Sequence, residues 1–517
     1  MPNLDIKIPA TEIIIPYEGL DFKNLEEKIM EALKETGKRV LEASIKAVDE
    51  MENRERAGGL KIKGLGSKYL ETVFGTIQYK RRRYYDAGKK GSRYLADEKL
   101  GIRKGAETSP VKDMLDGELA VLSGSYRNAS ELAKKYFISS RSHESIRQVV
   151  VREGKAMKAH QESEIEKIRV EAYTGGIVEG GNTPEVAYIE VDGTGLKIQK
   201  RRGLKRSRSR NREVKLGIVY SGHERRYAGG NGKQKKLKDK HVYASMEKAD
   251  RFMEKFSLRC EKVLKISKAK LKLLGGDGAE WIKEGKDNYF WDAKYVLCKF
   301  HQHRAIKKAL GYNRELEKKL KDYLNMDKLD EGIRFIDKII SNTGTEEKDQ
   351  LNKLKDLREY IANNREGINA IRRIKADLSK EDKRMMMNTG AIESNIYNVV
   401  TQRMKKRRMS WSESGAESML QLICRMMNEG GLDNWYRKDR QERIEITERD
   451  YRRLVANTVW SDRSSGYPLS AKLPALEGPC QDKIWVEVLR NMKDGDPVSS
   501  YGADVEVSAL EPKAEIN

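Results

Sequence analysis

Three short segments of this sequence each place an acidic residue where a regular element is predicted to end or begin. The segments are Ile189–Gly195, Leu273–Trp281 and Gly390–Asn395. We expect Asp192 to follow one β-strand, Asp277 to follow an adjacent strand, and Glu393 to project from a helix packed against the same sheet. Few folds bring three such positions together, so this arrangement limits the architecture more than any other feature.

Carboxylates placed in this way suit two divalent cations, Mg²⁺ or Mn²⁺, held for phosphoryl chemistry on nucleic acid. Asp192 and Asp277 would share one ion and Glu393 would complete the second site, while Gly193 would let the chain turn after the first strand. There is a simpler interpretation, because an aspartate beside glycine is usually a turn residue and a helical glutamate is usually solvated. Three such residues in apolar-flanked segments favour metal binding.

The charge balance indicates the kind of partner. The chain has 517 residues, with 103 Lys and Arg against 80 Asp and Glu, and a formal net charge of +23. This excess favours a polyanion, because each neutralised phosphate releases a counterion. The alternatives are a ribosome-associated protein or a merely basic one.

Cysteine usage and hydropathy indicate the compartment. None of the four cysteines forms a C-x-x-C pair, so the sequence predicts neither a zinc ribbon nor a disulfide framework, and a reducing cytosol fits best. The first residues lack the basic start and apolar stretch of a signal peptide, and no apolar run is long enough to span a bilayer. We expect a cytoplasmic protein with no membrane partner.

The middle of the chain predicts an α/β domain. Strands are expected at 186–192, 213–220, 241–246, 271–274 and 295–298, with helices over 248–264 and from about 279. Three sequential strands, then helix, strand, helix and strand, is the element order of a ribonuclease H-like sheet. Residues 302–378 read as helical throughout, and the helix from Ile392 has Asn388 or Thr389 as candidate caps.

The remaining regions follow from composition and periodicity. A glycine-rich linker at 175–182 marks the clearest boundary. We expect an N-terminal helix and basic β-rich region (1–105), a helix-turn-helix region with a linker helix (106–175), the first part of the ribonuclease H-like domain (184–301), an all-helical insertion (302–385), the last part of that domain with the helix of Glu393 (386–430), and a partly disordered C-terminal region (431–517).

The N-terminal third contains three predicted features. The first is a packing or oligomerisation helix over 25–51, and the second is a basic strand at 72–85 that either grips phosphates or forms a charged edge strand. The third is a helix-turn-helix, with helices at 129–137 and 143–150, a cap at Ser142, and a separate polar helix at 155–170. Arg147 and Gln148 would contact DNA, unless the pair is a plain helical hairpin.

Several motifs together resemble the ISLre family of bacterial insertion-sequence transposases, a Mutator-like branch of the DDE transposases. The matching segments are Val191–Thr194, Lys215–Ile218, Gly276–Ile282, Phe300–Ile306, Gly390–Asn395, Gln402–Arg407 and Met409–Ser412. The resemblance covers roughly Pro184 to Met427 strongly and the N-terminal third more loosely. It implies a ribonuclease H-like domain, with Asp192, Asp277 and Glu393 as the metal-binding triad and a helical insertion before the glutamate.

The resemblance also bears on residues near the triad. Mutator-like relatives carry Cys or Asp, two residues and then His after the second aspartate, and Cys298 and His301 fit that position. Many ISLre relatives have Asp there, so Cys298 is not expected to be an essential ligand. His301 would position DNA or the metal-site water, or else be a packed histidine. Glu280 would support Asp277 or simply favour the start of a helix.

Two basic runs would hold DNA near this site. They are the linker after the first strand, 200–212, and the segment that follows Glu393, 402–408. Charge runs are usually mobile and solvated, so order would come only on binding. The candidate DNA-binding residues are Arg201, Arg202, Lys205, Arg206, Arg208, Arg403, Lys405, Lys406 and Arg407.

The function implied by the resemblance is that of a bacterial DNA transposase. It would cleave transposon ends to free a 3′-hydroxyl, join that hydroxyl to target DNA, and act as a homo-oligomer at the nucleoid because two ends must be joined. A ribonuclease H-like nuclease without strand transfer would use the same triad. A non-enzymatic DNA-binding regulator would use only the helix-turn-helix.

Overall fold

The computed structural model describes residues 14–15, 21–56, 58–86, 91–136, 141–173, 180–199, 210–225, 235–344, 346–378, 383, 386, 388–406 and 409–437. Two compact units divide the chain. Within the described residues, the first unit draws on Met1–Gln161, Gly195–Arg212 and Tyr397–Asn457, and the second on Glu162–Thr194 and Glu213–Ile396. No helix in these ranges is both long and apolar enough to cross a membrane.

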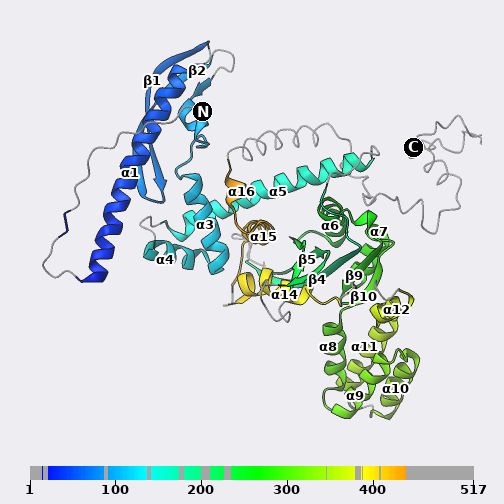
Figure 1. Ribbon diagram of the computed structural model, residues 1–517. Coiled ribbons are helices and arrows are strands. Elements are labelled where there is room, and N and C mark those ends of the chain that lie inside the picture. The colour runs from blue at the N-terminus through cyan, green and yellow to red at the C-terminus, as the bar shows by residue number, and fades with distance from the viewer. Residues whose placement is uncertain are drawn as a thin grey trace, which may run out of the picture. The chain divides into compact units, whose positions relative to one another are not determined.

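The first unit begins with a long helix over a small antiparallel sheet (Figure 1). Its elements are α1 (Phe22–Arg54), β1 (Leu60–Thr72), β2 (Gly75–Asp86), β3 (Gly91–Arg93) and α2 (Leu95–Lys99). The predicted helix at 25–51 is confirmed, and the strand predicted at 72–85 is confirmed from Gly75 on, whereas residues 73–74 form a turn. A tight turn joins β1 to β2, where the Thr72 hydroxyl donates to the carbonyl of Gly75 at 2.7 Å and Gly75 adopts a φ of +111°.

The basic strand β2 is not an edge strand, so that interpretation is wrong. β2 lies between β1 and β3, and two of its arginines are committed to buried acids. Arg81 Nε donates to Asp97 at 2.9 Å, and Arg82 Nη1 pairs with Asp49 at 2.6 Å. Tyr79 also donates to Asp97. These side chains stabilise the unit internally.

The predicted helical pair is present as α4 (Tyr126–Tyr136) and α5 (His143–Tyr173), preceded by α3 (Pro110–Ser123). Ser142 caps α5, since its Oγ accepts from the backbone N–H of Ser145 at 3.1 Å. The predicted turn at 138–141 lies almost wholly outside the described residues. A separate helix at 155–170 is wrong, because α5 continues through Gly154. A Cβ there would lie 2.4 Å from Ser418, so this glycine admits a neighbouring helix rather than breaking its own.

That neighbouring helix, α15 (Glu413–Glu429), and the short α16 (Asp433–Tyr436) complete the first unit. Neither was predicted from the sequence. Lys112 and Asp116, both fully buried, form an ion pair within α3, and Trp435 Nε1 of α16 donates to Glu153 of α5 at 2.8 Å. The predicted disorder near the C-terminus falls outside the described residues, which end at 437.

The second unit contains a five-stranded mixed sheet in the order β10-β9-β4-β5-β8. The strands are β4 (Val186–Ile198), β5 (Arg210–Tyr220), β8 (His241–Ser245), β9 (Leu271–Gly276) and β10 (Lys294–Leu297). β4, β9 and β10 are parallel neighbours, whereas β5 and β8 are antiparallel. All five predicted strands are confirmed, and an unpredicted hairpin, β6 (Gly222–Arg225) with β7 (Lys235–Lys238), follows β5.

The first strand of this sheet is longer than predicted. The chain does not turn at Gly193, because β4 runs through Asp192 and on to Ile198. Leu196 and Ile198 continue the alternation of buried residues, and Ile198 forms a parallel bridge with Trp411. The role of Gly193 is instead a close approach, since a Cβ there would lie 2.4 Å from the carboxylate of Glu213.

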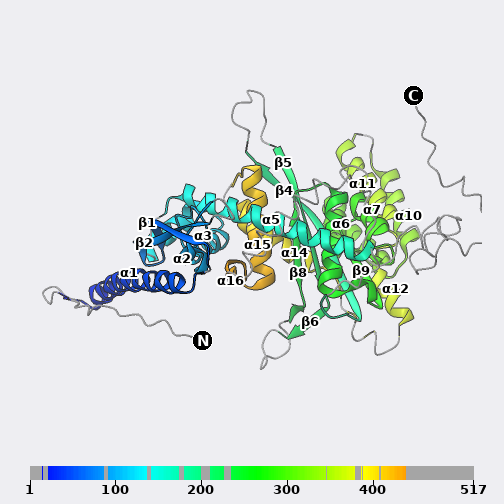
Figure 2. The ribbon, with the colours of Figure 1, turned by 90° about the horizontal axis from the view of Figure 1, so that it is seen from above.

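Helices α6 (Ala249–Leu264) and α7 (Glu280–Tyr289) lie side by side along the sheet (Figures 1 and 2). The aromatic rings of Phe252 and Phe256 on α6 are fully buried in the same core as Ile189 and Val191 of β4. The C-terminal part of α5 joins α6 through ion pairs such as Glu162–Lys255.

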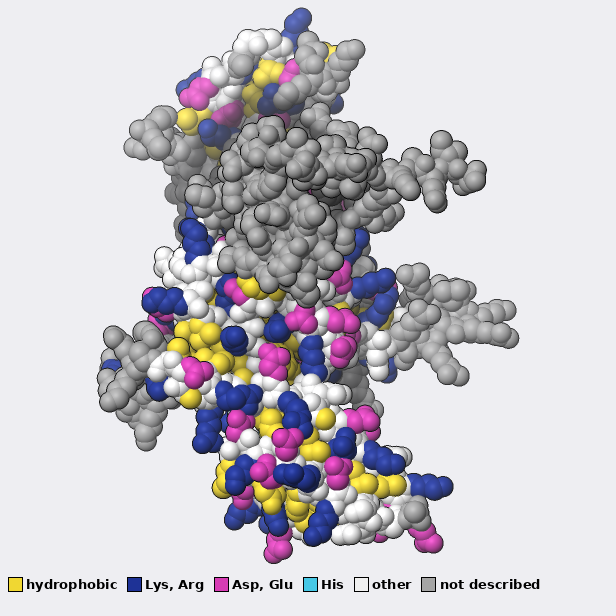
Figure 3. All heavy atoms as spheres, turned by 90° about the vertical axis from the view of Figure 1, so that its right-hand side faces the viewer, with side chains coloured by type: hydrophobic (Ala, Val, Ile, Leu, Met, Phe, Trp, Pro, Cys, Tyr) yellow, Lys and Arg dark blue, Asp and Glu magenta, His cyan; other side chains and the backbone are white. Residues whose placement is uncertain are grey.

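The predicted helical segment is confirmed as α8 (Lys299–Leu310), α9 (Arg314–Asn325), α10 (Leu329–Asn342), α11 (Lys348–Asn363) and α12 (Ala370–Asp377). Its apolar stripes, including Ile336, Leu354 and Leu357, are buried in a core continuous with that of the sheet. Lys and Arg side chains on the face in Figure 3 are interspersed with Asp and Glu over this segment, so its charge there is mixed. Beyond it come α14 (Ile392–Ile396) and a π-helical continuation, η2 (Tyr397–Lys405).

We predict that Asp97→Asn lowers the free energy of unfolding by about 3–5 kcal/mol, because Arg81 would remain buried without its counter-charge. Lys80→Gln, on the exposed side of the same strand, should change it by less than about 0.5 kcal/mol. Urea unfolding monitored by circular dichroism measures both. Equal transition midpoints for the two variants would contradict the internal role of this arginine.

Candidate metal site

The predicted acidic residues all lie in the second unit and come from different elements. Asp192 is on β4, Asp277 directly follows β9, and Glu393 is in the first turn of α14. His301 lies in the first turn of α8, and Cys298 immediately precedes that helix. β4 and β9 pair in parallel as far as Glu190 and Gly275, so Asp192 and Asp277 each lie two residues beyond the last pair, at the same edge of the sheet.

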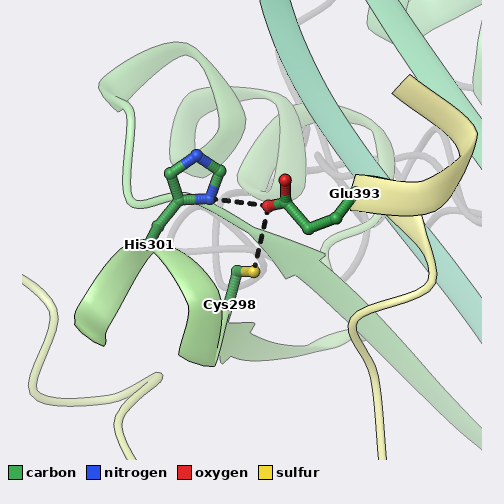
Figure 4. A group of neighbouring side chains, drawn as sticks. All are labelled: Cys298, His301 and Glu393. Carbon is green, nitrogen blue, oxygen red and sulfur yellow. Dashed lines mark hydrogen bonds and ion pairs between the residues drawn. The ribbon is translucent and has the colours of Figure 1, made fainter. Parts of the chain in front are cut away.

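These side chains converge. Ligand-capable atoms of Asp192, Asp277 and His301 lie within 4.8 Å of one another, and those of Cys298, His301 and Glu393 do the same. His301 belongs to both groups. Its Nδ1 is 3.0 Å from Oε1 of Glu393, to which Cys298 Sγ donates at 3.5 Å (Figure 4). One imidazole therefore links all three carboxylates.

The surroundings of Asp192 oppose ionisation of its carboxyl group. Burial raises the pKa of Asp192 to about 6, and the charges of Asp277 and Glu393 add to that shift. The nearby His301 and the N–H of Gly193, 2.7 Å from Asp192 Oδ1, act in the opposite direction. Crowded carboxylates of this kind favour any cation placed among them.

His301 supplies positive charge at this position. Hydrogen bonding with Cys298 and Glu393, together with the charge of Asp192, raises the pKa of His301 to about 10 despite burial. Burial opposes ionisation of Glu393, but the interaction with His301 outweighs it and lowers the pKa of that carboxyl. The imidazole is thus protonated at neutral pH and holds Glu393 ionised.

The helical segment holds Asp277 in place. The Asp277 carboxylate accepts a hydrogen bond from the N–H of Ala279 at 2.9 Å. Gly278, with a φ of +98°, permits the turn that this hydrogen bond requires. Tyr360 on α11 donates to the carbonyl oxygen of Asp277 at 2.8 Å. Asn364 packs so closely that a Cβ on Gly278 would lie 2.8 Å from it. A segment that follows Asp277 by some eighty residues therefore sets the shape of its loop.

A fourth acid, Glu190, was not identified as functional from the sequence. It lies on the same face of β4 as Asp192 and is 1% exposed. Its carboxylate accepts the backbone N–H groups of Gly390 (2.8 Å), Ala391 (3.2 Å) and Ile392 (3.2 Å). Tyr220 donates to it as well, at 2.6 Å. Burial raises the pKa of Glu190, and these hydrogen bonds oppose that shift.

Glu190 therefore caps the helix that carries Glu393, and the predicted caps at Asn388 and Thr389 are wrong. A carboxylate at a helix N-terminus satisfies free N–H groups and interacts favourably with the helix dipole. The sequence signal was an acid two residues before Asp192 in an otherwise apolar strand. The predicted inward face of the following helix is confirmed, since Ile396 and Val399 are buried.

The candidate DNA-binding residues have varied surroundings. Arg201, Arg202, Lys205, Arg206, Arg208 and Arg407 lie outside the described residues. Of the others, all in the first unit, Arg147 pairs with Glu144 at 2.6 Å, and Gln148 contacts the same carboxylate. Arg403 is partly buried, which lowers its pKa, and Lys406 lies over the ring of Tyr397 at 4.5 Å. Lys405 is exposed.

The donor set fits a hard divalent cation. Asp192 and Asp277 in one group and Glu393 in the other provide the oxygen ligands that Mg²⁺ and Mn²⁺ prefer. Glu280, by contrast, is exposed in the first turn of α7, where an acid favours the helix start.

The chain belongs to UPF0236, an uncharacterised protein family whose model matches residues 16–442. A UPF0236 protein of Caldanaerobacter subterraneus subsp. tengcongensis is 26% identical over 426 residues, covering 80% of this chain and 79% of its own. The name of that relative spans eleven locus designations. A UPF0236 protein of Streptococcus gallolyticus, named for the vanSb 3′ region, is 25% identical over 388 residues, covering 73% and 76%.

We predict that Asp192→Asn stabilises the protein at pH 8 in the presence of a chelator. Because the pKa of Asp192 rises from 3.8 to about 6 on folding, its ionised form destabilises the fold above pH 6 and the neutral form does not. The gain should be on the order of 2–3 kcal/mol and shrink as the pH falls toward 4. Thermal unfolding in EDTA measures it.

Glu280→Gln is the matched control, as it removes a nearby exposed charge and should leave the melting temperature almost unchanged. Added Mn²⁺ should raise the melting temperature of the wild type more than that of Asp192→Asn. A destabilised Asp192→Asn variant in EDTA would show that the carboxylates are not crowded as described.

We predict that Glu190→Gln weakens Mn²⁺ binding by misplacing Glu393 and lowers the free energy of unfolding by about 1–3 kcal/mol. The new amide nitrogen would face backbone N–H groups that now donate to a carboxylate oxygen. Tyr220→Phe removes only one of the four hydrogen bonds and keeps the helix cap. Titration calorimetry should therefore give a much smaller loss of affinity for Tyr220→Phe. Equal affinities in all three proteins would contradict the role of Glu190.

Proposed function

We propose that this protein is a DNA transposase whose metal-dependent site is formed by Asp192, Asp277 and Glu393, with His301 beside them. The observation that carries the proposal is the convergence of these side chains around one imidazole. The three acids come from segments that are far apart along the chain. Such a site suits phosphodiester chemistry, in which negative charge develops on several oxygens at once.

The sheet supports a ribonuclease H-like assignment. β4, β5 and β8 lie side by side in chain order, and β9 and β10 add to the other side of β4. Helix α6 precedes β9, and α7 precedes β10. This is the element order expected of such a domain, with the helical segment α8–α12 placed before the glutamate as the motif resemblance implies.

Two further observations favour a mobile element over a general nuclease. The motifs around the three acids resemble those of ISLre transposases. One relative also carries eleven locus designations in a single organism and another carries four, as repeated copies of one gene would. The net charge of +23 suits a DNA partner in the bacterial cytoplasm, at the nucleoid.

The residues divide the work as follows. Asp192, Asp277 and Glu393 would hold Mg²⁺ or Mn²⁺, which would activate the nucleophile and stabilise the leaving oxygen. His301 keeps Glu393 ionised and in place through Nδ1. Glu190 fixes the helix on which Glu393 stands. Burial of Asp192 reduces the number of waters that compete for the site.

The same site serves two reactions in succession. In the first, water attacks a phosphorus at the element end, the bond to the 3′ oxygen breaks, and a 3′-hydroxyl and a 5′-phosphate are released. In the second, that 3′ oxygen attacks a target phosphodiester, so one P–O bond forms as another breaks. No external energy source is required. A homo-oligomer would bring the two ends together.

We predict that the intact protein, with Mg²⁺ and labelled DNA from both flanks of its gene, releases 3′-hydroxyl ends and joins them to a plasmid. Asp277→Asn should reduce both activities by about 100-fold or more, while DNA binding persists. Glu280→Gln should retain them. Cleavage without joining would favour the nuclease, and binding without any metal-dependent cleavage would favour the regulator.

A further inference from the structure

A cavity of about 230 Å³ lies in the second unit between the first turns of α8 and α12. α8 also carries Cys298 and His301 at its start, so this helix borders both the cavity and the acidic site. The segment before Gly390 forms another wall. Polar and charged residues that line the cavity are Lys299, Gln302, Asn369, Arg372, Lys375, Asn388 and Thr389.

The lining of this cavity is cationic. Three of its side chains, Lys299, Arg372 and Lys375, carry positive charge, and none of the described residues that line it is acidic. Arg81, Arg82 and Arg147 are each paired with a carboxylate. Lys299 and Lys375 make no ion pair within the described ranges, and Arg372 spends one nitrogen on the carbonyl of Asn325 at 2.6 Å. The surrounding charge therefore remains available to a ligand.

Two helix N-termini add to this potential. The first turn of α8 and the first turn of α12 both contribute to the wall, and neither helix has a side-chain hydrogen bond from its N-cap residue. The first N–H groups of a helix have no partner within it, and the helix dipole places partial positive charge there. Such ends bind anions, phosphate in particular.

Gln302 points independently to a ligand. It is only 8% exposed, it lines the cavity, and its side-chain amide makes no hydrogen bond within the described part of the chain. The amide therefore faces the cavity and has no protein partner of its own among the described residues. A ligand with acceptor oxygens would satisfy its Nε2 donor.

We propose that this cavity binds a phosphate group of the nucleic-acid strand that is processed at the acidic site. The identity of the polyanion rests on the proposed function, and the anionic chemistry rests on the cavity itself. A volume of about 230 Å³ is far more than a single water needs, so a phosphate and part of its sugar fit. Lys299 and Arg372 are exposed at its rim, which lets a longer strand continue outward.

The cavity would thus hold the strand beside the first turn of α8, next to the carboxylates that act on it. A phosphate fixed there limits how the neighbouring phosphodiester can approach Asp192 and Asp277. The cavity is a positioning site, and none of its side chains would touch the reacting atoms.

The test is DNA binding by fluorescence anisotropy over a range of salt concentrations, with EDTA present so that no strand is cut. Lys375→Gln should weaken binding about three- to tenfold and reduce the slope of log K against log salt by about 0.7–0.9, the value for one phosphate contact. Lys355→Gln is the matched control, since Lys355 is an exposed lysine on α11 that does not line the cavity. Its slope should equal that of the wild type or change less.

Gln302→Leu separates a ligand role from a structural one. Removal of an unpartnered buried amide should leave the melting temperature unchanged or raise it, whereas DNA affinity should fall. A folded Gln302→Leu variant with wild-type DNA affinity would count against the proposal. So would equal slopes for Lys375→Gln and Lys355→Gln.

Inorganic phosphate and a 5′-deoxynucleotide distinguish the sources of the anion. If either raises the melting temperature of the wild type but not of Lys375→Gln, while DNA slopes are equal, the cavity takes a small free anion and the proposal is overturned. Loss of slope without metal-dependent cleavage would retain the cavity and reject the transposase. Metal-dependent cleavage with equal salt slopes for Lys375→Gln and Lys355→Gln would retain the transposase and reject the cavity.

Discussion

The candidate site depends on one buried carboxylate that no catalytic motif contains. Glu190 accepts three backbone N–H groups from residues 390–392, which are about two hundred positions away in sequence. This contact ties the strand of Asp192 to the helix of Glu393. Because a buried carboxylate is stable only when its oxygens are fully hydrogen-bonded, the two elements can meet in few other ways. The position of Glu393 thus follows from the hydrogen bonds that Glu190 on β4 accepts from residues 390–392.

The helical segment between β10 and α14 has a comparable role at Asp277. Its apolar faces share a core with the sheet, and its Tyr360 holds the backbone of the Asp277 loop. The same segment contributes α12 to the cationic cavity. An insertion of this kind is therefore part of the site rather than an appendage to it. The acidic site and the cavity both border the first turn of α8, so groups of opposite charge lie within one turn of the same helix.

Local sequence predicted most helices and strands. It failed where a contact with a residue distant in the sequence determines where an element ends. The apolar alternation of the strands and the three acids were readable because periodicity and turn residues are local signals. The end of β4 was misplaced, because Gly193 and Gly195 resemble a turn although Ile198 pairs with Trp411. The break predicted between 150 and 155 does not exist, since α5 continues through Gly154, which accommodates Ser418. A glycine in the sequence does not show whether it permits a backbone turn or makes room for a packed neighbouring element.

The sequence by itself determined the kinds of residue available: an excess of cations, three acids in apolar settings, and a histidine three residues after a cysteine. Tertiary structure alone decided that these acids share one imidazole, that Glu190 caps the last helix, and that Arg81 and Arg82 face inward to carboxylates. The physical reason is the range of the interactions. Propensity and periodicity act over a few residues, whereas burial and charge pairing depend on which distant side chains share a low-dielectric space.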